Sequence, residues 1–404
     1  MIYHPGWITT IIYPMESSTT ITCQVFCHAG SLYESRNTNG LSHFLEHMFF
    51  KGGIKYPTSQ SISYTLDAIW AEHNAYTSNQ VASYYVKSSP EHRLTWLDVL
   101  SDMMCHATFP HEEVSKEQWV ILQELQMYKD QPRSWMNLNA QLWYHGDNPY
   151  GWPILGTQDT IKAVSHDSLM NHKQSLYTKD NMIIVIAGKT PSIDLLLGTI
   201  EELFGWLPES SSLSKSIYTG YKPSNHSSCL KQWTNQSHIT MFINGIPKTD
   251  SRMYQARLLG NMLGGTTSSR LRQEIREKRW LCYYIWSWHS DSKEFWTWNI
   301  NAWLDKEKLD EWVDIIHTLL DEFTQASITS QEFELAQSNF IWWLQMWMET
   351  SDEVADRLGN RYMNRGDIIT LNQLIEIYRS ITLDEVKQLC AMFDKKYRYL
   401  YWIE

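Results

Sequence analysis

Two histidines and a glutamate within five residues are the part of this sequence best suited to chemistry. The segment His-Phe-Leu-Glu-His spans residues 43–47. On a helix, His43 and His47 stand four residues apart and present both imidazoles on one face, within reach of one metal ion. Glu46 lies beside them, and this H-x-x-E-H order is the inverted form of a zinc-hydrolase signature. The alternative for so short a motif is a helix that carries two ordinary histidines.

The flanking residues predict where this helix begins and ends. Ser42 or Asn39 is suited to cap its N-terminus through a side-chain oxygen. The run Lys51-Gly-Gly53 follows the apolar positions and is typical of a helix stop. The motif therefore sits on a short helix with its own start and stop signals.

A third protein ligand is expected, because catalytic zinc usually has three protein ligands and one water. The segment 117–125 indicates a second helix, with Val120 and Ile121 turned toward the core. Glu117 and Glu124 are two helical turns apart and share a face of that helix. A carboxylate from this face would complete a zinc site, whereas the alternative for both glutamates is a solvated helix surface.

The chain resembles the M16 metallopeptidases, the family of pitrilysin, insulin-degrading enzyme and mitochondrial processing peptidase, in its single-unit branch. The resemblance covers nearly the whole chain and rests on three segments in its first half: Ala-Gly-Ser-Leu-Tyr-Glu at 29–34, Asn-Gly-Leu-Ser-His-Phe-Leu-Glu-His-Met at 39–48, and Asn-Ala-Tyr-Thr at 74–77.

The resemblance implies a role for each matching residue. It implies one Zn²⁺ per chain, held by His43, His47 and Glu124. It makes Glu46 the base that acts on water and Glu117 an auxiliary glutamate that orients a ligand. It further implies that an edge strand binds the peptide substrate through three residues: Asn74, Ala75 and Tyr76.

A second matching segment lies in the other half of the chain, at residues 263–283. Family members hold an arginine and a tyrosine seven residues apart here, which grip the substrate and assist catalysis, and Arg276 and Tyr283 have that spacing. A guanidinium suits carbonyl and oxyanion oxygens because its donors form a planar fork. Without the resemblance, a surface arginine and a half-buried tyrosine would be the favoured interpretation.

Length and internal repetition predict two domains. A chain of 404 residues is long for one core and suits two of about 200 residues each. Strand-like and helix-like segments recur at an offset of roughly 215 residues. The predicted fold is α+β, with two homologous domains that each pack a mainly antiparallel sheet against helices. We expect a zinc-binding domain at 1–207, a linker at 208–230, and at 231–404 a homologous domain that lacks the zinc motif.

Composition excludes several classes of function. The formal charge of −11 argues against nonspecific nucleic-acid binding. No apolar run approaches the length of a membrane span, and no signal peptide is visible at Met1 and the residues after it. Six cysteines are spread without a disulfide framework. These features together favour a cytoplasmic protein without a membrane partner.

The sequence therefore predicts a zinc-dependent endopeptidase that cleaves unfolded peptides or short proteins. The resemblance implies a clamshell chamber formed by two chains, as a homodimer or as a heterodimer with a paralogous chain. Two alternatives remain open. One is a non-catalytic scaffold or core subunit of the same fold. The other is a dedicated processing peptidase for a leader peptide or a modified peptide.

Overall fold

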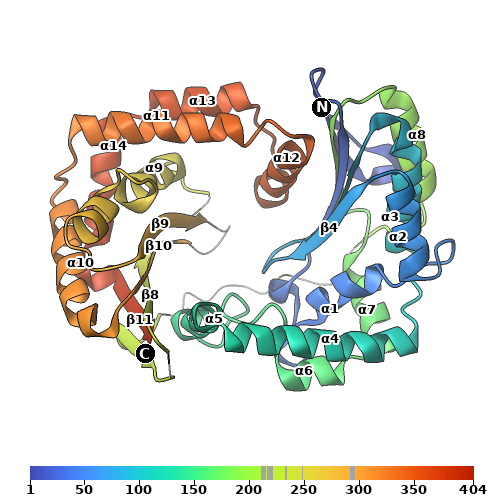
Figure 1. Ribbon diagram of the computed structural model, residues 1–404. Coiled ribbons are helices and arrows are strands. Elements are labelled where there is room, and N and C mark those ends of the chain that lie inside the picture. Colours follow the sequence, from blue (N-terminus) through green and yellow to red (C-terminus); the bar gives the residue numbers. More distant parts are fainter. Residues whose placement is uncertain (211–214, 216–221, 233, 248, 292–295) are drawn as a thin grey trace. The chain divides into compact units, whose positions relative to one another are not determined.

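A computed structural model of the protein contains two units, each built around its own β-sheet (Figure 1). The structure describes residues 1–404 except 211–214, 216–221, 233, 248 and 292–295. The first unit comprises Met1–Met127, Trp152–Ile217 and Trp347–Ile368, and the second comprises Tyr128–Gly151, Tyr218–Met346 and Ile369–Glu404. Each unit therefore contains a segment from the other half of the sequence. Ten residues of the expected linker 208–230, namely 211–214 and 216–221, lie outside the described residues, and its last four form a strand.

A six-stranded sheet forms the centre of the first unit. Its strands follow the order β1-β2-β6-β3-β5-β4, and every neighbouring pair is antiparallel except β2 with β6. Every residue of the central strands β3 and β6 is buried, and β6 accordingly has a continuous apolar sequence. The strands are β1 (Ile2–Tyr3), β2 (Thr9–Pro14), β3 (Ile21–Cys27), β4 (Glu72–Thr77), β5 (Ala82–Ser88) and β6 (Met182–Gly188).

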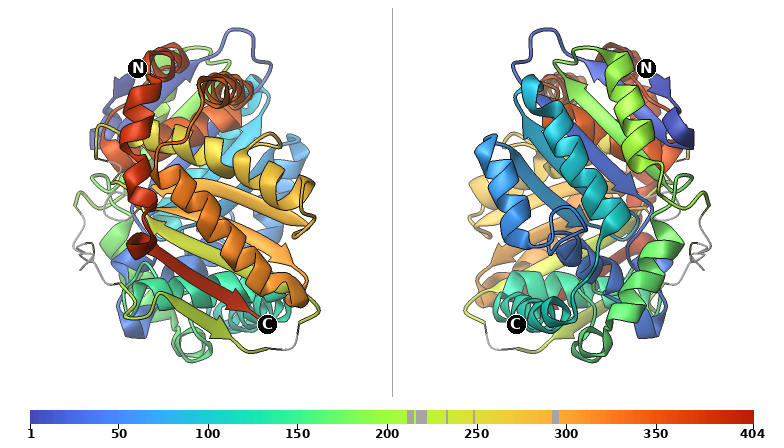
Figure 2. Two further views of the ribbon diagram at one scale, coloured as in Figure 1. Left: turned by 90° about the vertical axis from the view of Figure 1, so that its left-hand side faces the viewer. Right: turned by 90° about the vertical axis from the view of Figure 1, so that its right-hand side faces the viewer.

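Helices cover both faces of this sheet. Helices α2, α3 and α8 lie on one face, and α12 lies on the opposite face (Figures 1 and 2). Helix α1 contacts β4 and β5 at the edge of the sheet. The helices are α1 (Leu41–Phe49), α2 (Ser59–Ala68), α3 (Arg93–His106), α4 (His111–Asp130, whose last three residues belong to the second unit), α6 (Gln158–Ala163), α7 (His166–Leu176), α8 (Ile193–Phe204) and α12 (Ser351–Arg365).

Helix α12 reaches the first sheet from a distant part of the chain and fits closely against β3. The Ser351 hydroxyl lies 2.9 Å from that of Thr20 and 2.8 Å from that of Thr22. Further along the helix, Gly359 has no side chain to separate the helix from the ring of Phe26. A Cβ placed on Gly359 would lie 2.0 Å from that ring, which is itself fully buried. A small residue is therefore required at this crossing.

The second unit is also built on a mainly antiparallel sheet. Its strand order is β7-β11-β8-β10-β9, and only β7 and β11 pair in parallel. Helix α5 packs on β8 and β11, and α9 contacts β9 (Figures 1 and 2). The strands are β7 (Ser227–Leu230), β8 (Ser237–Asn244), β9 (Tyr284–Asp291), β10 (Trp296–Leu304) and β11 (Arg398–Ile403). The helices are α5 (Pro132–His145), α9 (Met253–Gly264), the π-helix η5 (Arg272–Glu277), α10 (Leu309–Thr324), α11 (Ser330–Met346), α13 (Leu371–Ser380) and α14 (Leu383–Gln388).

Both units thus combine a mainly antiparallel sheet with packed helices, and the predicted α+β class is confirmed. All six cysteines are free thiols in this fold. Among the described residues, no helix has both the length and the apolar character needed to cross a bilayer.

The contact between Gly359 and Phe26 predicts a stability difference between two helical glycines. We expect Gly359→Ala to lower the free energy of unfolding by about 1–3 kcal/mol, because the added methyl overpacks a rigid core. Gly198 of α8 has open space around its Cβ position, so Gly198→Ala is the matched control and should raise the free energy of unfolding by about 0.5–1 kcal/mol. Urea unfolding followed by circular dichroism measures both. A Gly359→Ala protein as stable as the wild type would contradict the packing described for α12.

Candidate metal centre

A buried carboxylate fixes the start of helix α1. Glu34 is 5% exposed, and its carboxylate accepts hydrogen bonds from the backbone N–H of Gly40 (2.9 Å) and of Ser42 (2.7 Å). These N–H groups lie at the N-terminal end of the helix, where backbone donors have no partner within the helix. Gly40 precedes the helix at φ +93°, and a Cβ there would lie 2.5 Å from the carbonyl oxygen of Leu155.

The expected cap from Ser42 or Asn39 is wrong. Ser42 lies inside the helix, where its hydroxyl accepts from the Gly30 N–H (3.0 Å) and lies 2.8 Å from His172 Nε2. The Asn39 amide donates to the Glu34 carboxylate (3.2 Å) and does not cap the helix. A carboxylate distant by several residues therefore replaces the local cap that the sequence predicts.

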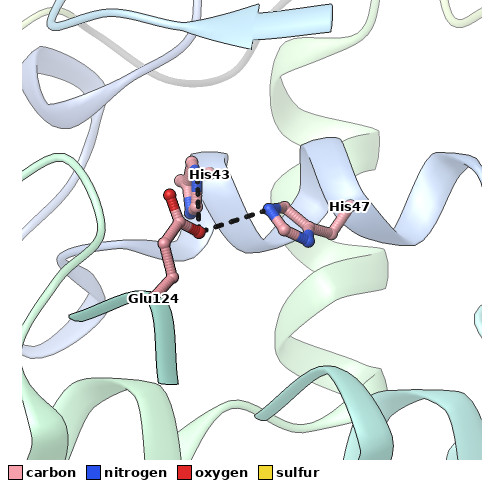
Figure 3. A group of neighbouring side chains, drawn as sticks. All are labelled: His43, His47 and Glu124. Atoms are coloured by element: carbon pink, nitrogen blue, oxygen red, sulfur yellow. Dashed lines mark ion pairs between the residues drawn. The ribbon is translucent and has the colours of Figure 1, made fainter. Parts of the chain in front are cut away.

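The side chains of His43, His47 and Glu124 converge on one point (Figure 3). Both histidines project from the same face of α1, and Glu124 approaches from α4. Glu124 Oε2 lies 3.8 Å from His43 Nε2 and 3.8 Å from His47 Nε2. One ligand atom from each residue lies within 4.8 Å of the others. This is the only such group of three or more His, Cys, Asp or Glu residues in the part of the chain that the structure describes.

Glu117 is not one of the three converging residues. It contacts the Nδ1 atom of His47, whereas Nε2 of the same ring faces Glu124. Its carboxylate is 2.9 Å from His47 Nδ1 and also forms an ion pair with Lys51. Although burial favours the neutral form, the hydrogen bonds from His47 and Lys51 lower the pKa of Glu117 below its ordinary value. Although burial favours the neutral imidazole, the contact with Glu117 raises the pKa of His47 above its ordinary value. In the neutral ring, a charged Glu117 favours the proton on Nδ1, which leaves the lone pair on Nε2, the atom that faces Glu124.

Burial shifts the pKa values of His43 and Glu124 in opposite directions. Burial, with a smaller contribution from His47, lowers the pKa of His43 to about 3. The imidazole of His43 is therefore neutral at pH 7 and offers a lone pair. Burial also raises the pKa of Glu124 above its ordinary value, with His47 opposing. A cation between these groups would relieve the cost of burying the carboxylate charge.

The donor set fits a zinc ion. Two imidazole nitrogens and one carboxylate oxygen are ligands that zinc takes in catalytic sites. Ligand atoms of a tetrahedral zinc ion are about 3.3 Å apart when each bond is about 2.0–2.1 Å, and the two N···O distances of 3.8 Å come close to this value. Three protein ligands leave one position for water or substrate.

Glu46 lies next to the three converging side chains but points to a different partner. Its Oε2 accepts a hydrogen bond from the hydroxyl of Thr77 on β4. Burial raises the pKa of Glu46 above its ordinary value, and the hydrogen bond from Thr77 partly opposes this shift. A partly buried carboxylate with raised basicity beside a metal site is suited to take a proton from water.

The other predicted residues occupy two different units. Asn74, Ala75 and Tyr76 lie on β4, which is the edge strand of the first sheet. Arg276 and Tyr283 belong to the second unit. There the Arg276 guanidinium lies 2.8 Å from Glu277 Oε1, and the Tyr283 side chain is 71% exposed and stacks on Trp303.

Three contributors were given no role at the metal centre in the sequence interpretation: Glu34, Lys51 and Thr77. Lys51 follows His47 by one helical turn, so its place near Glu117 has a local signal in the sequence. Glu34 contacts residues six and eight positions later in the sequence, and Thr77 contacts one that is 31 positions earlier. Only their inclusion in the matching segments 29–34 and 74–77 pointed to them. Val120 was expected to face the core, but it is 38% exposed, while its neighbour Ile121 is fully buried.

Known proteins align with this chain over nearly its whole length. A zinc protease of Bacillus subtilis described as "Uncharacterized zinc protease YmxG" is 32% identical over 94% of this chain and 91% of its own length. A Rickettsia bellii protein, "Uncharacterized zinc protease", is 30% identical over 94% and 91% of the two chains. The crystal structure of a protease from Helicobacter pylori superposes with a TM-score of 0.90 at 18% identity, covering 98% of this chain and 97% of that one.

Family models divide the chain into two consecutive matches. The description "Insulinase (Peptidase family M16)" matches residues 10–158, which include the converging histidines and Glu124. The description "Peptidase M16 inactive domain" matches residues 163–340. A crystal structure of a peptidase M16 inactive domain from Pseudomonas fluorescens has a TM-score of 0.91 at 16% identity, covering 100% of this chain and 97% of that one. The chain belongs to the M16 peptidase family.

Proposed function

We propose that this protein is a zinc-dependent endopeptidase that cleaves unfolded peptides or short proteins. The observation that carries the proposal is the convergence of His43, His47 and Glu124 with Glu46 at their side. Relatives that align over nearly the whole chain are named zinc proteases. A scaffold protein of the same fold would need none of these four side chains, so their joint presence favours an enzyme.

The residues divide the chemistry among them. His43, His47 and Glu124 would hold the ion, which when bound supplies a Lewis acid that activates water and polarises the scissile carbonyl. Glu46 takes the proton from the attacking water and later donates it to the leaving amine. Glu117 keeps the His47 ring in its orientation and tautomer through the Nδ1 hydrogen bond.

The edge of the first sheet supplies a place for an extended peptide. Within the described part of the chain, strand β4 is paired with β5 on one side only, so its other edge offers backbone N–H and C=O groups to a partner. A substrate segment added there would form main-chain hydrogen bonds with Asn74, Ala75 and Tyr76. Main-chain pairing accepts many sequences but requires an unfolded segment, which matches the proposed substrate class.

The second unit contributes the remaining proposed groups. Arg276 offers planar donors to substrate carbonyl oxygens. The exposed hydroxyl of Tyr283 would stabilise the developing oxyanion. We propose that two chains, either identical or paralogous, assemble into a chamber in which the zinc site of one chain faces Arg276 and Tyr283 of the other.

The first test separates metal binding from catalysis. We expect His47→Ala to lose both zinc and peptidase activity, because it removes a ligand. Glu46→Gln should retain stoichiometric zinc and lose about 10²–10⁴-fold in kcat, because only the proton acceptor is gone. Zinc is measured by inductively coupled plasma mass spectrometry and cleavage with a quenched fluorescent peptide library. Stoichiometric zinc in the His47→Ala protein would refute the ligand assignment.

The contact between Glu117 and His47 predicts an effect on zinc affinity. We expect Glu117→Gln to weaken zinc binding by about 10–100-fold, since a lost outer-shell partner typically has that effect. Glu113→Gln is the matched control, because Glu113 also lies on α4 and pairs with a lysine, Lys116, at the surface (2.6 Å). Competition with a chromophoric chelator measures both affinities. Equal zinc affinities for the two variants would show that Glu117 does not support His47.

Mixing two inactive variants tests the proposed shared site. Glu46→Gln and Tyr283→Phe should each have low activity for different reasons. A mixed dimer would keep one complete site, built from the intact Glu46 of one chain and the intact Tyr283 of the other. Part of the activity should return once native mass spectrometry detects mixed dimers. Mixed dimers that remain as inactive as both parents would rule out a site shared in this way.

A further inference from the structure

We propose that Thr77 is a positioning residue that holds Glu46 in the orientation needed for proton transfer. This inference rests on the proposed function. The Thr77 hydroxyl donates to Oε2 of Glu46 across the contact between β4 and α1. Both side chains are partly buried, so water competes for this hydrogen bond less than at an open surface.

The backbone around Thr77 is fixed to the same framework as α1. The turn after β4 accepts a hydrogen bond from the Leu32 N–H at the Asn79 carbonyl (3.0 Å). The same turn packs against Gly30, where a Cβ would lie 2.1 Å from the Ser78 carbonyl oxygen. Gly30 in turn donates its N–H to the hydroxyl of Ser42 on α1 (3.0 Å). Both ends of the Thr77–Glu46 hydrogen bond are therefore anchored to one rigid segment.

The opposite face of β4 is held as well. Side chains alternate along a strand, so Tyr76 points away from α1 while Thr77 points toward it. The Tyr76 hydroxyl donates to Asp356 Oδ1 (2.8 Å) and accepts from the Asn360 amide (2.8 Å), both on α12. With its neighbour fixed on the other face, Thr77 has little freedom to turn away from Glu46.

This arrangement has a consequence for catalysis. A free glutamate has three side-chain torsions and can present either oxygen in many directions. The hydrogen bond occupies Oε2 and leaves Oε1 to accept the proton of the attacking water. It also links the base to the strand that would pair with the substrate, since Thr77 directly follows Tyr76. The base and the bound peptide are then positioned by the same strand, which favours a reactive alignment.

The kinetic test removes the hydroxyl and keeps the shape of the side chain. We expect Thr77→Val to lower kcat by about 10–100-fold, with KM within about twofold of wild type, because a misplaced base slows only the chemical step. Zinc content should stay unchanged. Thr77→Ser should retain most of the activity, because it keeps the donor. Thr9→Val on β2 of the same sheet controls for a threonine-to-valine exchange in a strand and should leave kcat unchanged.

A structural readout tests the inference without relying on activity. In crystals of zinc-loaded Thr77→Val, the Glu46 side chain should occupy more than one rotamer, whereas the wild type should show one. A single wild-type rotamer in the variant would overturn the proposal, as would a wild-type kcat, a change confined to KM, or equal losses in Thr77→Val and Thr77→Ser. If the wild type cleaves no peptide at all, the proposed function fails, and the rotamer comparison still decides the role of Thr77.

Discussion

The start of helix α1 is the constraint on which the candidate metal centre depends, and the Glu34 carboxylate sets it. By accepting the N–H groups of Gly40 and Ser42, it satisfies donors that would otherwise be buried without partners. Although burial raises the pKa of Glu34 above its ordinary value, these two backbone hydrogen bonds favour its charged form. Because His43 follows Ser42 directly, a fixed first turn also fixes the direction in which both histidines project. Only then can α4 place one carboxylate against both rings.

The second constraint is the contribution of α12 to a sheet formed by the other half of the chain. The helix closes one face of the first sheet with an apolar cluster that includes Phe26 and Leu358. It also brings Asp356 and Asn360 to the hydroxyl of Tyr76 on β4. Strand β4 is thereby held from both faces, by α1 on one and α12 on the other. Because α12 belongs to the first unit although it comes late in the sequence, the proposed substrate strand β4 is held by residues about 280 positions away.

Local patterns predicted what local physics determines. The spacing of His43 and His47 was sufficient to place them on one helical face, and two helical turns were sufficient to relate Glu117 to Glu124. The α+β class followed from alternating strand and helix patterns. Contacts outside such local patterns were not accessible in this way. No local signal assigns α12 to the first sheet, and no ordinary capping pattern makes Glu34, rather than Ser42 or Asn39, the cap of α1. Val120 was misplaced because adjacent positions on a helix differ by about 100°, so a small error in the estimated apolar face reverses the burial of one residue.

The most direct test of the central claim is the coordination shell of the bound metal, measured by X-ray absorption at the zinc edge on purified protein. The account predicts one zinc per chain with two imidazole nitrogens and one carboxylate oxygen, completed by a light atom, at about 2.0–2.1 Å. The six free cysteines make the opposite result easy to recognise, because thiolate sulfur lies at about 2.3 Å and scatters strongly. A sulfur shell, or a zinc spectrum unchanged by His47→Ala, would contradict the assignment of His43, His47 and Glu124 as the metal ligands.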